Sequence, residues 1–253
     1  MRVLMMGGSG LVGSLILPAF REQYGAKQIR ILDVRPPDAT VAGDCEYVAG
    51  SVTDASALAA SLTGFGADDV LVYLVMGPGA NWSSTQTVAG HFDAGVKGVY
   101  LALDAAVNAG VRHVVYSSSL SAYRMDDPAR FYTEAVPPDA TGYYGLTKRF
   151  GETICAAFCE RVSGFSVNAL RLCYPLQLAE WEARVRDDPS SGYTAIATAG
   201  PDVAAAYLAA TRIRFGGFEA FHISGDASES RMRLQKAKTL LGWTPRHVRA
   251  DAL

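Results

Sequence analysis

The sequence predicts a Rossmann-type α/β fold: a doubly wound parallel sheet with helices on both faces and a small C-terminal substrate lobe. Three observations predict it. Short runs of Val, Ile, Leu and Met recur along the chain, amphipathic stretches of helical length separate them, and a glycine-rich turn follows the first run. Runs that are apolar throughout are typical of parallel strands covered on both faces.

The expected strands, in chain order, are residues 3–6, 29–32, 47–48, 70–76, 114–116, 167–172 and 220–223. The expected helices between them are residues 11–24, 55–62, 94–108, 144–161 and 203–212. Because crossovers between parallel strands are right-handed, this order predicts a ligand crevice at the carboxyl ends of the strands. We expect residues 1–170 to form the Rossmann domain. Residues 171–253 are expected to form the small lobe, partly interleaved with the sheet.

Composition excludes several classes of protein. The chain has 253 residues, 49% of them hydrophobic, which is typical of one globular unit. A net charge of −2 and scattered Lys and Arg argue against a nucleic-acid partner. The longest apolar runs, such as residues 70–76, are far shorter than the ~20 residues of a membrane span, and the N-terminus has no signal-peptide layout. We therefore expect no membrane partner and a cytoplasmic location.

Neither a metal site nor a disulfide is expected. The four cysteines have no metal-ligand spacing, and the four histidines lie in unrelated segments. The residues concerned are Cys45, Cys155, Cys159, Cys173, His91, His113, His222 and His247.

The glycine-rich turn predicts a nucleotide site. Gly7, Gly10 and Gly13 follow the first strand and open the first helix, with the spacing G-x-x-G-x-x-G. A turn without side chains lets a pyrophosphate reach the backbone N–H groups at the positive end of a helix. A purely structural turn is the alternative. Asp33, which ends the second strand 20 residues after Gly13, favours the nucleotide interpretation because a carboxylate there binds the adenosine ribose.

Asp33 also favours NAD, because its charge would repel the 2′-phosphate of NADP. Arg35 lies two residues further on and could pair with that phosphate, so NADP is not excluded. Ser51 and Val52 follow the third strand, where they would flank the adenine ring. The following Thr53 and Asp54 could equally cap the helix at residue 55.

The catalytic residues are expected further along. The strand 114–116 runs into Ser117, Ser118, Ser119 and Ser121, and Tyr144 and Lys148 then occupy positions i and i+4 of a helix. A tyrosine with a pKa near 10 is a poor base at neutral pH, so a nearby cation is needed to favour tyrosinate. Lys148 would supply that charge and also hold the nicotinamide ribose. Ser119 would hydrogen-bond the substrate oxygen.

In these residues the sequence resembles the extended short-chain dehydrogenase/reductase superfamily, the NAD-dependent epimerases and dehydratases. The order of the glycine turn, Asp33, the Tyr144/Lys148 pair, Arg171 and the terminal Gly-Trp-Thr-Pro at residues 242–245 carries the resemblance. It implies Ser119, Tyr144 and Lys148 as catalytic residues. The sequence departs from the family at Ser51, Gly95 and Tyr174. The resemblance implies further cofactor contacts at Leu11, Val12, Leu74, Val75, Met76, Ser117 and Tyr174, and substrate contacts at Gly77, Ser118, Ser119, Ser121 and Arg184.

The lobe after the sixth strand is short, since only 31 positions separate Arg171 from Asp202. This shortness resembles the uronate dehydrogenases of the superfamily, in which an arginine of that loop grips the sugar carboxylate. Arg184 or Arg186 could take this role, or either could be a solvated charge. The expected activity is hydride transfer between NAD(P) and a hydroxyl of a small polar substrate, a free sugar or sugar acid.

Two other functions stay open: an epimerase or dehydratase that uses NAD transiently, and a regulatory protein that binds NAD(P) without turnover. The loop of residues 124–141, rich in Asp and Pro, is either an active-site flap or a passive surface loop. The resemblance favours a homodimer formed through the helices 94–108 and 144–161, whose apolar character is also compatible with burial inside one subunit.

Overall fold

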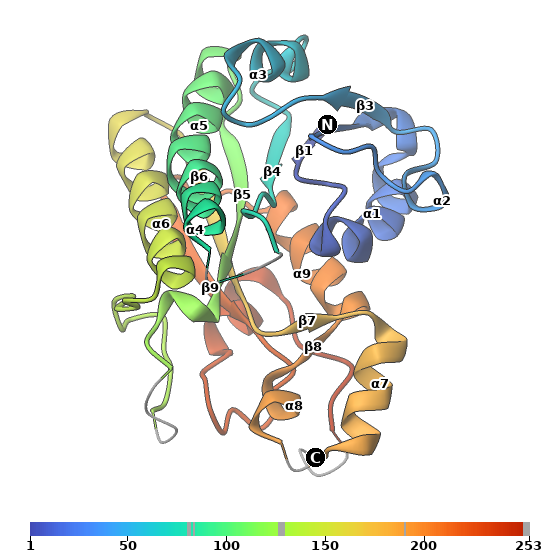
Figure 1. The fold of residues 1–253 in the computed structure, drawn as a ribbon, viewed down its shortest axis with the longest axis vertical. Helices are drawn as coiled ribbons and strands as arrows, with labels where there is room; N and C mark the ends of the chain where they lie inside the picture. The colour runs from blue at the N-terminus through green and yellow to red at the C-terminus, as the bar shows by residue number, and fades with distance from the viewer. Residues whose placement is uncertain (80–81, 83, 126–129, 190, 250–253) are drawn as a thin grey trace.

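A sheet of parallel strands divides the molecule into two layers of helices (Figure 1). The computed structural model describes residues 1–79, 82, 84–125, 130–189 and 191–249. The strand order is β3-β2-β1-β4-β5-β6-β9, which reverses direction between β1 and β4 as a doubly wound fold requires. The strands are β1 (Val3–Met6), β2 (Ile29–Asp33), β3 (Glu46–Ala49), β4 (Val70–Tyr73), β5 (His113–Ser119), β6 (Ser166–Leu172) and β9 (Phe218–Ile223).

All seven predicted strands are confirmed. β1 has the predicted bounds, and the other six differ from theirs at one or both ends, most of all β5 and β4. The fifth, β5, extends through the serines to Ser119, because Ser119 is still paired with Leu172 of β6. The fourth, β4, ends at Tyr73 rather than residue 76. The Leu74 N–H bonds to the Met6 carbonyl, and β1 supplies no further partner beyond that point.

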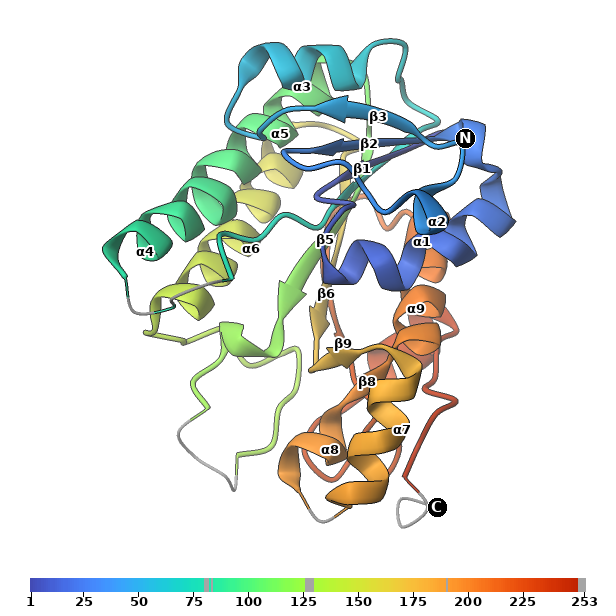
Figure 2. The ribbon, with the colours of Figure 1, turned by 45° about the vertical axis from the view of Figure 1, so that its right-hand side comes forward.

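The helices lie on the two faces of the sheet, as Figure 2 shows. On one face are α3 (Ala55–Leu62), α4 (Thr85–Phe92), α5 (Gly98–Asn108) and α6 (Tyr143–Arg161). On the other are α1 (Leu11–Tyr24), the short α2 (Ala39–Ala42) and α9 (Gly200–Arg212). A separate hydrophobic core fills each layer. The expected helix 94–108 is wrong at its start, because a π-helical turn, Asp93–Lys97, joins α5 to α4.

The segment between β6 and α9 forms the small lobe beyond the carboxyl ends of the strands (Figure 2). It contains β7 (Pro175–Leu176), α7 (Leu178–Asp187), α8 (Gly192–Ile196) and β8 (Thr198–Ala199), none of which was predicted. Trp181 anchors α7, because its indole N–H donates to the Ala197 carbonyl at 3.1 Å. The later α9 and β9 return to the main layers. Short 3-10 turns (Ala26–Gln28, Leu120–Ala122) and a π turn (Ala237–Leu241) complete the described elements.

Two negative findings concern the residues that the structure describes. None of their helices is both long and apolar enough to cross a membrane. No three of their His, Cys, Asp or Glu side chains gather in a way that could hold a metal ion.

Candidate active site

The glycine-rich turn between β1 and α1 leaves room for a ligand at the helix end. Gly7 has φ +86°, and a Cβ there would lie 2.8 Å from the Val75 backbone nitrogen. A Cβ on Gly13 would lie 2.0 Å from the Gly8 carbonyl oxygen, so only glycine allows the helix to pack against this turn. The turn therefore needs glycine at both positions for steric reasons.

The first turn of α1 has backbone donors that no side chain caps. Gly10 is the N-cap residue and makes no side-chain cap hydrogen bond, and the first turn contains no acidic residue. The N–H groups at such a helix end need an acceptor, and an anion satisfies them. Leu11 and Val12 lie in this turn. The residues present therefore fit the pyrophosphate of a dinucleotide.

Asp33 lies at the carboxyl end of β2, beside the same turn. Its carboxylate accepts hydrogen bonds from the Ser9 backbone N–H at 3.0 Å and the Arg35 backbone N–H at 3.1 Å. Ser9 in turn donates its hydroxyl to the Arg35 carbonyl at 2.7 Å. These contacts hold the carboxylate next to the glycine turn, where the sequence predicts it, while the Arg35 side chain is exposed.

The two residues expected to flank the adenine, Ser51 and Val52, differ in their contacts and burial. The Ser51 hydroxyl lies 2.9 Å from the Thr53 hydroxyl, and Val52 is buried in the core. Asp54 is the N-cap of α3, accepting from the Ser56 N–H at 2.8 Å, so the capping interpretation is confirmed for Asp54. The adenine contacts of Ser51 and Val52 stay a prediction.

Leu74, Val75 and Met76 follow β4 and lead away from the sheet toward α4. Leu74 is buried, Val75 is half-buried and Met76 is exposed. Gly77 lies against the His91 backbone of α4. This segment follows β4 at the place where the strand order reverses, and its cofactor contacts stay a prediction.

Ser119 and Tyr144 lie together at the carboxyl end of β5. Burial raises the pKa of Tyr144, and a hydrogen bond with Ser119 acts in the opposite direction. The Ser119 oxygen also accepts from the Ser121 N–H at 3.1 Å, which orients its hydroxyl. The structure therefore joins two of the three predicted catalytic side chains directly.

Lys148 lies one turn further along α6, almost fully buried. Its Nζ donates to the Ser117 carbonyl at 2.7 Å and lies 5.8 Å from the centre of the Tyr144 ring. Burial lowers the pKa of Lys148 to about 8, although the nearby Glu152 carboxylate acts to raise it. The predicted lowering of the Tyr144 pKa by Lys148 belongs to the cofactor-bound protein and stays a prediction.

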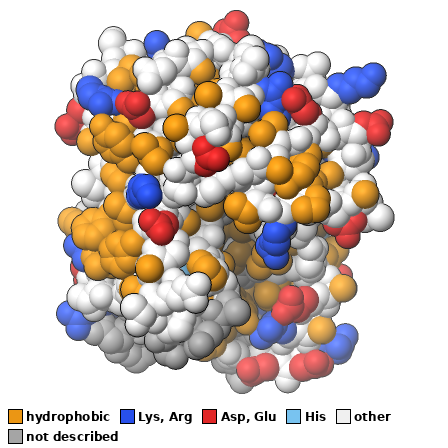
Figure 3. Space-filling model, turned by 45° about the horizontal axis from the view of Figure 1, so that its top comes forward, with side chains coloured by type: hydrophobic (Ala, Val, Ile, Leu, Met, Phe, Trp, Pro, Cys, Tyr) orange, Lys and Arg blue, Asp and Glu red, His pale blue; other side chains and the backbone are white. Residues whose placement is uncertain are grey.

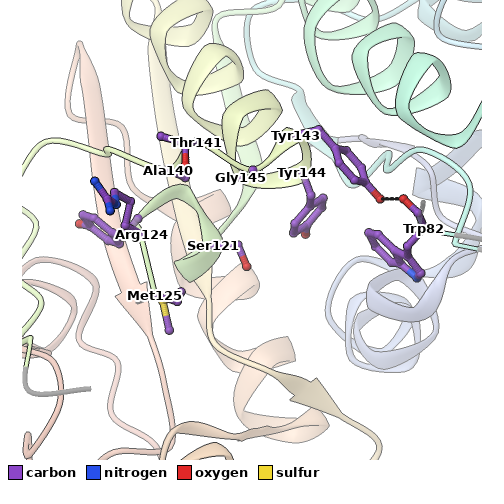
Figure 4. Close-up of a pocket in the computed structure, with 11 residues that line it drawn as sticks. Trp82, Ser121, Arg124, Met125, Ala140, Thr141, Tyr143, Tyr144 and Gly145 are labelled. Atoms are coloured by element: carbon purple, nitrogen blue, oxygen red, sulfur yellow. Dashed lines mark hydrogen bonds between the residues drawn. The ribbon is translucent and has the colours of Figure 1, made fainter. Parts of the chain in front are cut away.

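Tyr144 opens onto a cavity of about 500 Å³, shown in Figure 4. Ser121, in the 3-10 turn Leu120–Ala122 that follows β5, forms one wall. Other walls come from the segment around residue 125, the start of α6, and Trp82 between β4 and α4. The loop 124–141, predicted to be either an active-site flap or a passive surface loop, thus contributes lining residues to the cavity. Its residues 126–129 lie outside the described residues. The lining residues are Trp82, Ser121, Tyr123, Arg124, Met125, Ala140, Thr141, Gly142, Tyr143, Tyr144 and Gly145.

Ser118, a predicted substrate contact, makes its hydrogen bond to a side chain outside the cavity lining. Its hydroxyl donates to Glu152 of α6 at 2.5 Å. Glu152 also accepts from Arg171 of β6, at 2.9 Å from Nε and 2.7 Å from Nη2, and this ion pair is buried. Arg171 donates to the Tyr123 hydroxyl, which lies 3.1 Å from His222 Nε2. Ser118 therefore belongs to a buried polar network rather than to the described cavity lining.

Tyr174 and Arg184, also predicted site residues, lie together at a second cavity of about 390 Å³ between α7 and α8. The Arg184 guanidinium is 5.3 Å from the centre of the Tyr174 ring and pairs with Glu180 at 2.8 Å. Asp187 and Asp188 line the same cavity. The structure does not place Arg184 among the residues lining the Tyr144 cavity. Arg186 pairs with Asp187 at 3.0 Å on the exposed face of α7.

Sequence reasoning missed three aromatic residues beside Tyr144. The ring centres of Trp82 and His91 lie 5.8 and 5.6 Å from that of Tyr144. The ring centre of Tyr143 lies 6.3 Å from that of Trp82. Only tertiary packing brings the segment after β4 to the start of α6, so no local motif signals these contacts. The sequence shows only that Tyr143 and Tyr144 are neighbours, and that Tyr144 alone of the two has a lysine four residues later.

The chain matches a known protein family. A model of the NAD dependent epimerase/dehydratase family matches residues 3–176. L-arabinose 1-dehydrogenase (NAD(P)(+)) of Haloferax volcanii is 26% identical over 203 residues, which cover 75% of this chain and 73% of that protein.

Solved structures share the fold over nearly the whole chain. MoeE5 in complex with UDP-glucuronic acid and NAD has a TM-score of 0.78 at 22% identity, covering 98% of this chain and 94% of that one. A mutated uronate dehydrogenase has a TM-score of 0.76 at 22% identity, covering 98% of this chain and 82% of that one. These likenesses show the shared architecture.

Proposed function

We propose that this chain, which belongs to the NAD-dependent epimerase/dehydratase family, is a dehydrogenase. Its substrate is a small free sugar or sugar acid, and NAD accepts the hydride. One observation carries the proposal: Tyr144, which bonds to Ser119 and lies one helical turn before the buried Lys148 amine, lines a cavity of about 500 Å³ that can hold a sugar ring. The Haloferax relative, named for oxidising a free pentose, supports the choice of substrate class.

The catalytic roles follow from the contacts. When bound, NAD supplies the ring carbon that takes the hydride from the substrate carbinol. Tyr144 accepts the proton of the substrate hydroxyl, and Ser119 donates a hydrogen bond to the same oxygen as it becomes a carbonyl. The Lys148 ammonium favours the tyrosinate form. We assign Ser121 to the substrate because it lines the same cavity.

The cofactor end of the site uses the glycine turn and Asp33. The uncapped N–H groups of α1 bind the pyrophosphate, and Asp33 binds the adenosine ribose. Ser117, Leu74, Val75, Met76 and Tyr174 are assigned to the nicotinamide half, from the resemblance and from their places at the strand ends. NAD is preferred because Asp33 brings negative charge to the position of a 2′-phosphate.

We also propose that the protein acts as a homodimer in the cytoplasm. The helices α5 and α6 pack side by side, with Arg161 and Asp104 paired at 3.2 Å. They expose Tyr100 and Phe150, which are 45% and 41% accessible. Figure 3 shows hydrophobic side chains gathered on the side of the molecule that these helices occupy. A pair of such faces would bury this apolar surface.

The direct test is a substrate screen that follows the absorbance of reduced nicotinamide. Free pentoses, hexoses and hexuronates are offered with NAD, and UDP-sugars are offered in parallel. We expect net NAD reduction with at least one free sugar. Conversion of a UDP-sugar without net NAD reduction, and no turnover of any free sugar, would instead favour the epimerase or dehydratase. Absence of both activities, with NAD binding retained, would favour the regulatory protein.

A further inference from the structure

Trp82 is the most exposed aromatic wall of the Tyr144 cavity. It lies between β4 and α4 and is 46% accessible, whereas Trp181 and Trp243 are buried. It lines the same cavity as Tyr144 and Ser121 (Figure 4). An indole left this open inside a cavity is a large apolar surface that a ligand can cover.

The position of Trp82 is set from the catalytic helix. The Tyr143 hydroxyl donates to the Trp82 carbonyl at 2.6 Å, the hydrogen bond drawn in Figure 4. Tyr143 directly precedes Tyr144, so one turn of α6 both positions Trp82 and carries the proposed catalytic base, Tyr144. The indole stands perpendicular to the Tyr144 ring, with 5.8 Å between the ring centres.

His91 supports the indole from α4. Its ring centre is 5.1 Å from that of Trp82 and 5.3 Å from that of Tyr143, and the imidazole is buried. His91 Nε2 lies 3.2 Å from the Pro78 carbonyl, which ties α4 to the segment leaving β4. The wall is therefore held by two helices rather than by its own segment alone.

The lining of this cavity suits a polyhydroxyl ring. Among its described lining residues, Arg124 is the one that carries a full charge at neutral pH. The others are aromatic, small or hydroxyl-bearing, apart from the apolar Met125. A sugar ring has one face of C–H groups and a rim of hydroxyls. The negative face of an indole attracts the polarised C–H groups, while Ser121 and Thr141 can bond the rim.

We propose that Trp82 stacks on the C–H face of the sugar and determines specificity for a single free ring, with Tyr143 as its positioning residue. The inference rests on the proposed function and deepens it. It assigns a binding role to a residue that the predicted Ser119, Tyr144 and Lys148 chemistry does not use.

The first test is the split between KM and kcat for the free sugar that the screen identifies. We expect Trp82→Ala to raise KM about 10- to 30-fold while kcat changes less than about threefold, because the contact is present before and during the chemical step. Trp82→Phe, which keeps an aromatic face, should restore most of the affinity. Tyr143→Phe should raise KM about two- to fivefold and leave the pH profile of kcat unchanged.

The second test needs no turnover. Tryptophan fluorescence of the wild type is titrated with L-arabinose and with D-glucuronate. Because Trp181 and Trp243 are buried, we expect the sugar-dependent change to come from Trp82 and to be absent in Trp82→Phe. Thermal melting of each variant confirms that it is folded.

The outcomes separate the two claims. No turnover of any free sugar would overturn the proposed function and this inference with it. Turnover with a KM that Trp82→Ala leaves within twofold would overturn this inference alone. A KM increase in Tyr193→Ala in place of Trp82→Ala would do the same, because Tyr193 lines the second cavity.

Discussion

Asp33 is the single residue on which the choice between NAD and NADP depends most. Both of its carboxylate oxygens are held by backbone N–H groups, from Ser9 and Arg35, so the charge has a fixed place beside the glycine turn. A fixed carboxylate discriminates more strongly than a mobile one, because it cannot move away from a 2′-phosphate.

We expect Asp33→Ser to lower kcat/KM for NAD about 10- to 100-fold, through the lost ribose hydrogen bonds, and to improve the relative use of NADP. The measurement is kcat/KM with each cofactor. Arg35→Ala is the matched control and should change NAD use little, because Arg35 contacts Asp33 through its backbone N–H. A wild type that prefers NADP would contradict the role given to Asp33.

Glu152 connects three elements that build the site. It lies on α6, accepts from Ser118 at the end of β5, and pairs with Arg171 of β6. Both ionised side chains are at most 5% accessible. Removing one charge of a buried pair leaves the other without compensation, which costs more than the pair itself contributes.

We expect Glu152→Ala to lower the free energy of unfolding by about 3–5 kcal/mol, measured by urea denaturation. Glu152→Gln, which keeps an acceptor oxygen, should lose less. Glu180→Gln breaks the exposed pair with Arg184 and should change stability by less than about 1 kcal/mol. Equal, small effects of Glu152→Ala and Glu180→Gln would show that the buried network does not hold these elements together.

The elements differ in how well the sequence predicts them, for physical reasons. Most strands of the main sheet are buried and largely apolar, so they were predicted, whereas the half-exposed edge strand β3 was predicted only as residues 47–48. The helix α7 was missed because half of its residues are charged and only Trp181 of its residues is buried. The two-residue strands β7 and β8 form only because the lobe brings Pro175 beside Thr198. Where β4 ends depends on the neighbouring β1, which local sequence does not reveal.

The candidate site divides in the same way. The glycine turn, Asp33 and the Tyr144/Lys148 pair are local patterns, so the elements that carry them could be predicted, while their roles stay predictions. The Trp82 wall and the redirection of Ser118 to Glu152 arise from contacts between distant segments. Ser118 and Ser119 both contact α6, but Ser118 bonds to Glu152 in the middle of that helix and Ser119 bonds to Tyr144 in its first turn.

For the whole molecule, the exposed face of α5 and α6 is where we expect the second subunit. Phe150→Asp would place a charge in that apolar contact, so we expect a dimeric wild type to become a monomer with unchanged helix content. Size-exclusion chromatography with light scattering measures this. Leu240→Asp is the control, since Leu240 is similarly exposed but lies outside these helices, and should leave the dimer intact. A monomeric wild type would refute the dimer.

The central claim is that Tyr144 moves the substrate proton. The decisive measurement compares kcat and NAD affinity in the wild type and Tyr144→Phe, with Tyr143→Phe as the neighbouring control. Because only the proton path is removed, we expect kcat to fall about 10²- to 10⁴-fold while the Kd for NAD stays within about twofold. Burial raises the pKa of Tyr144, so the wild-type oxidation rate should increase with pH above neutrality. Near-normal turnover in Tyr144→Phe, or a parallel loss of NAD binding, would contradict the account.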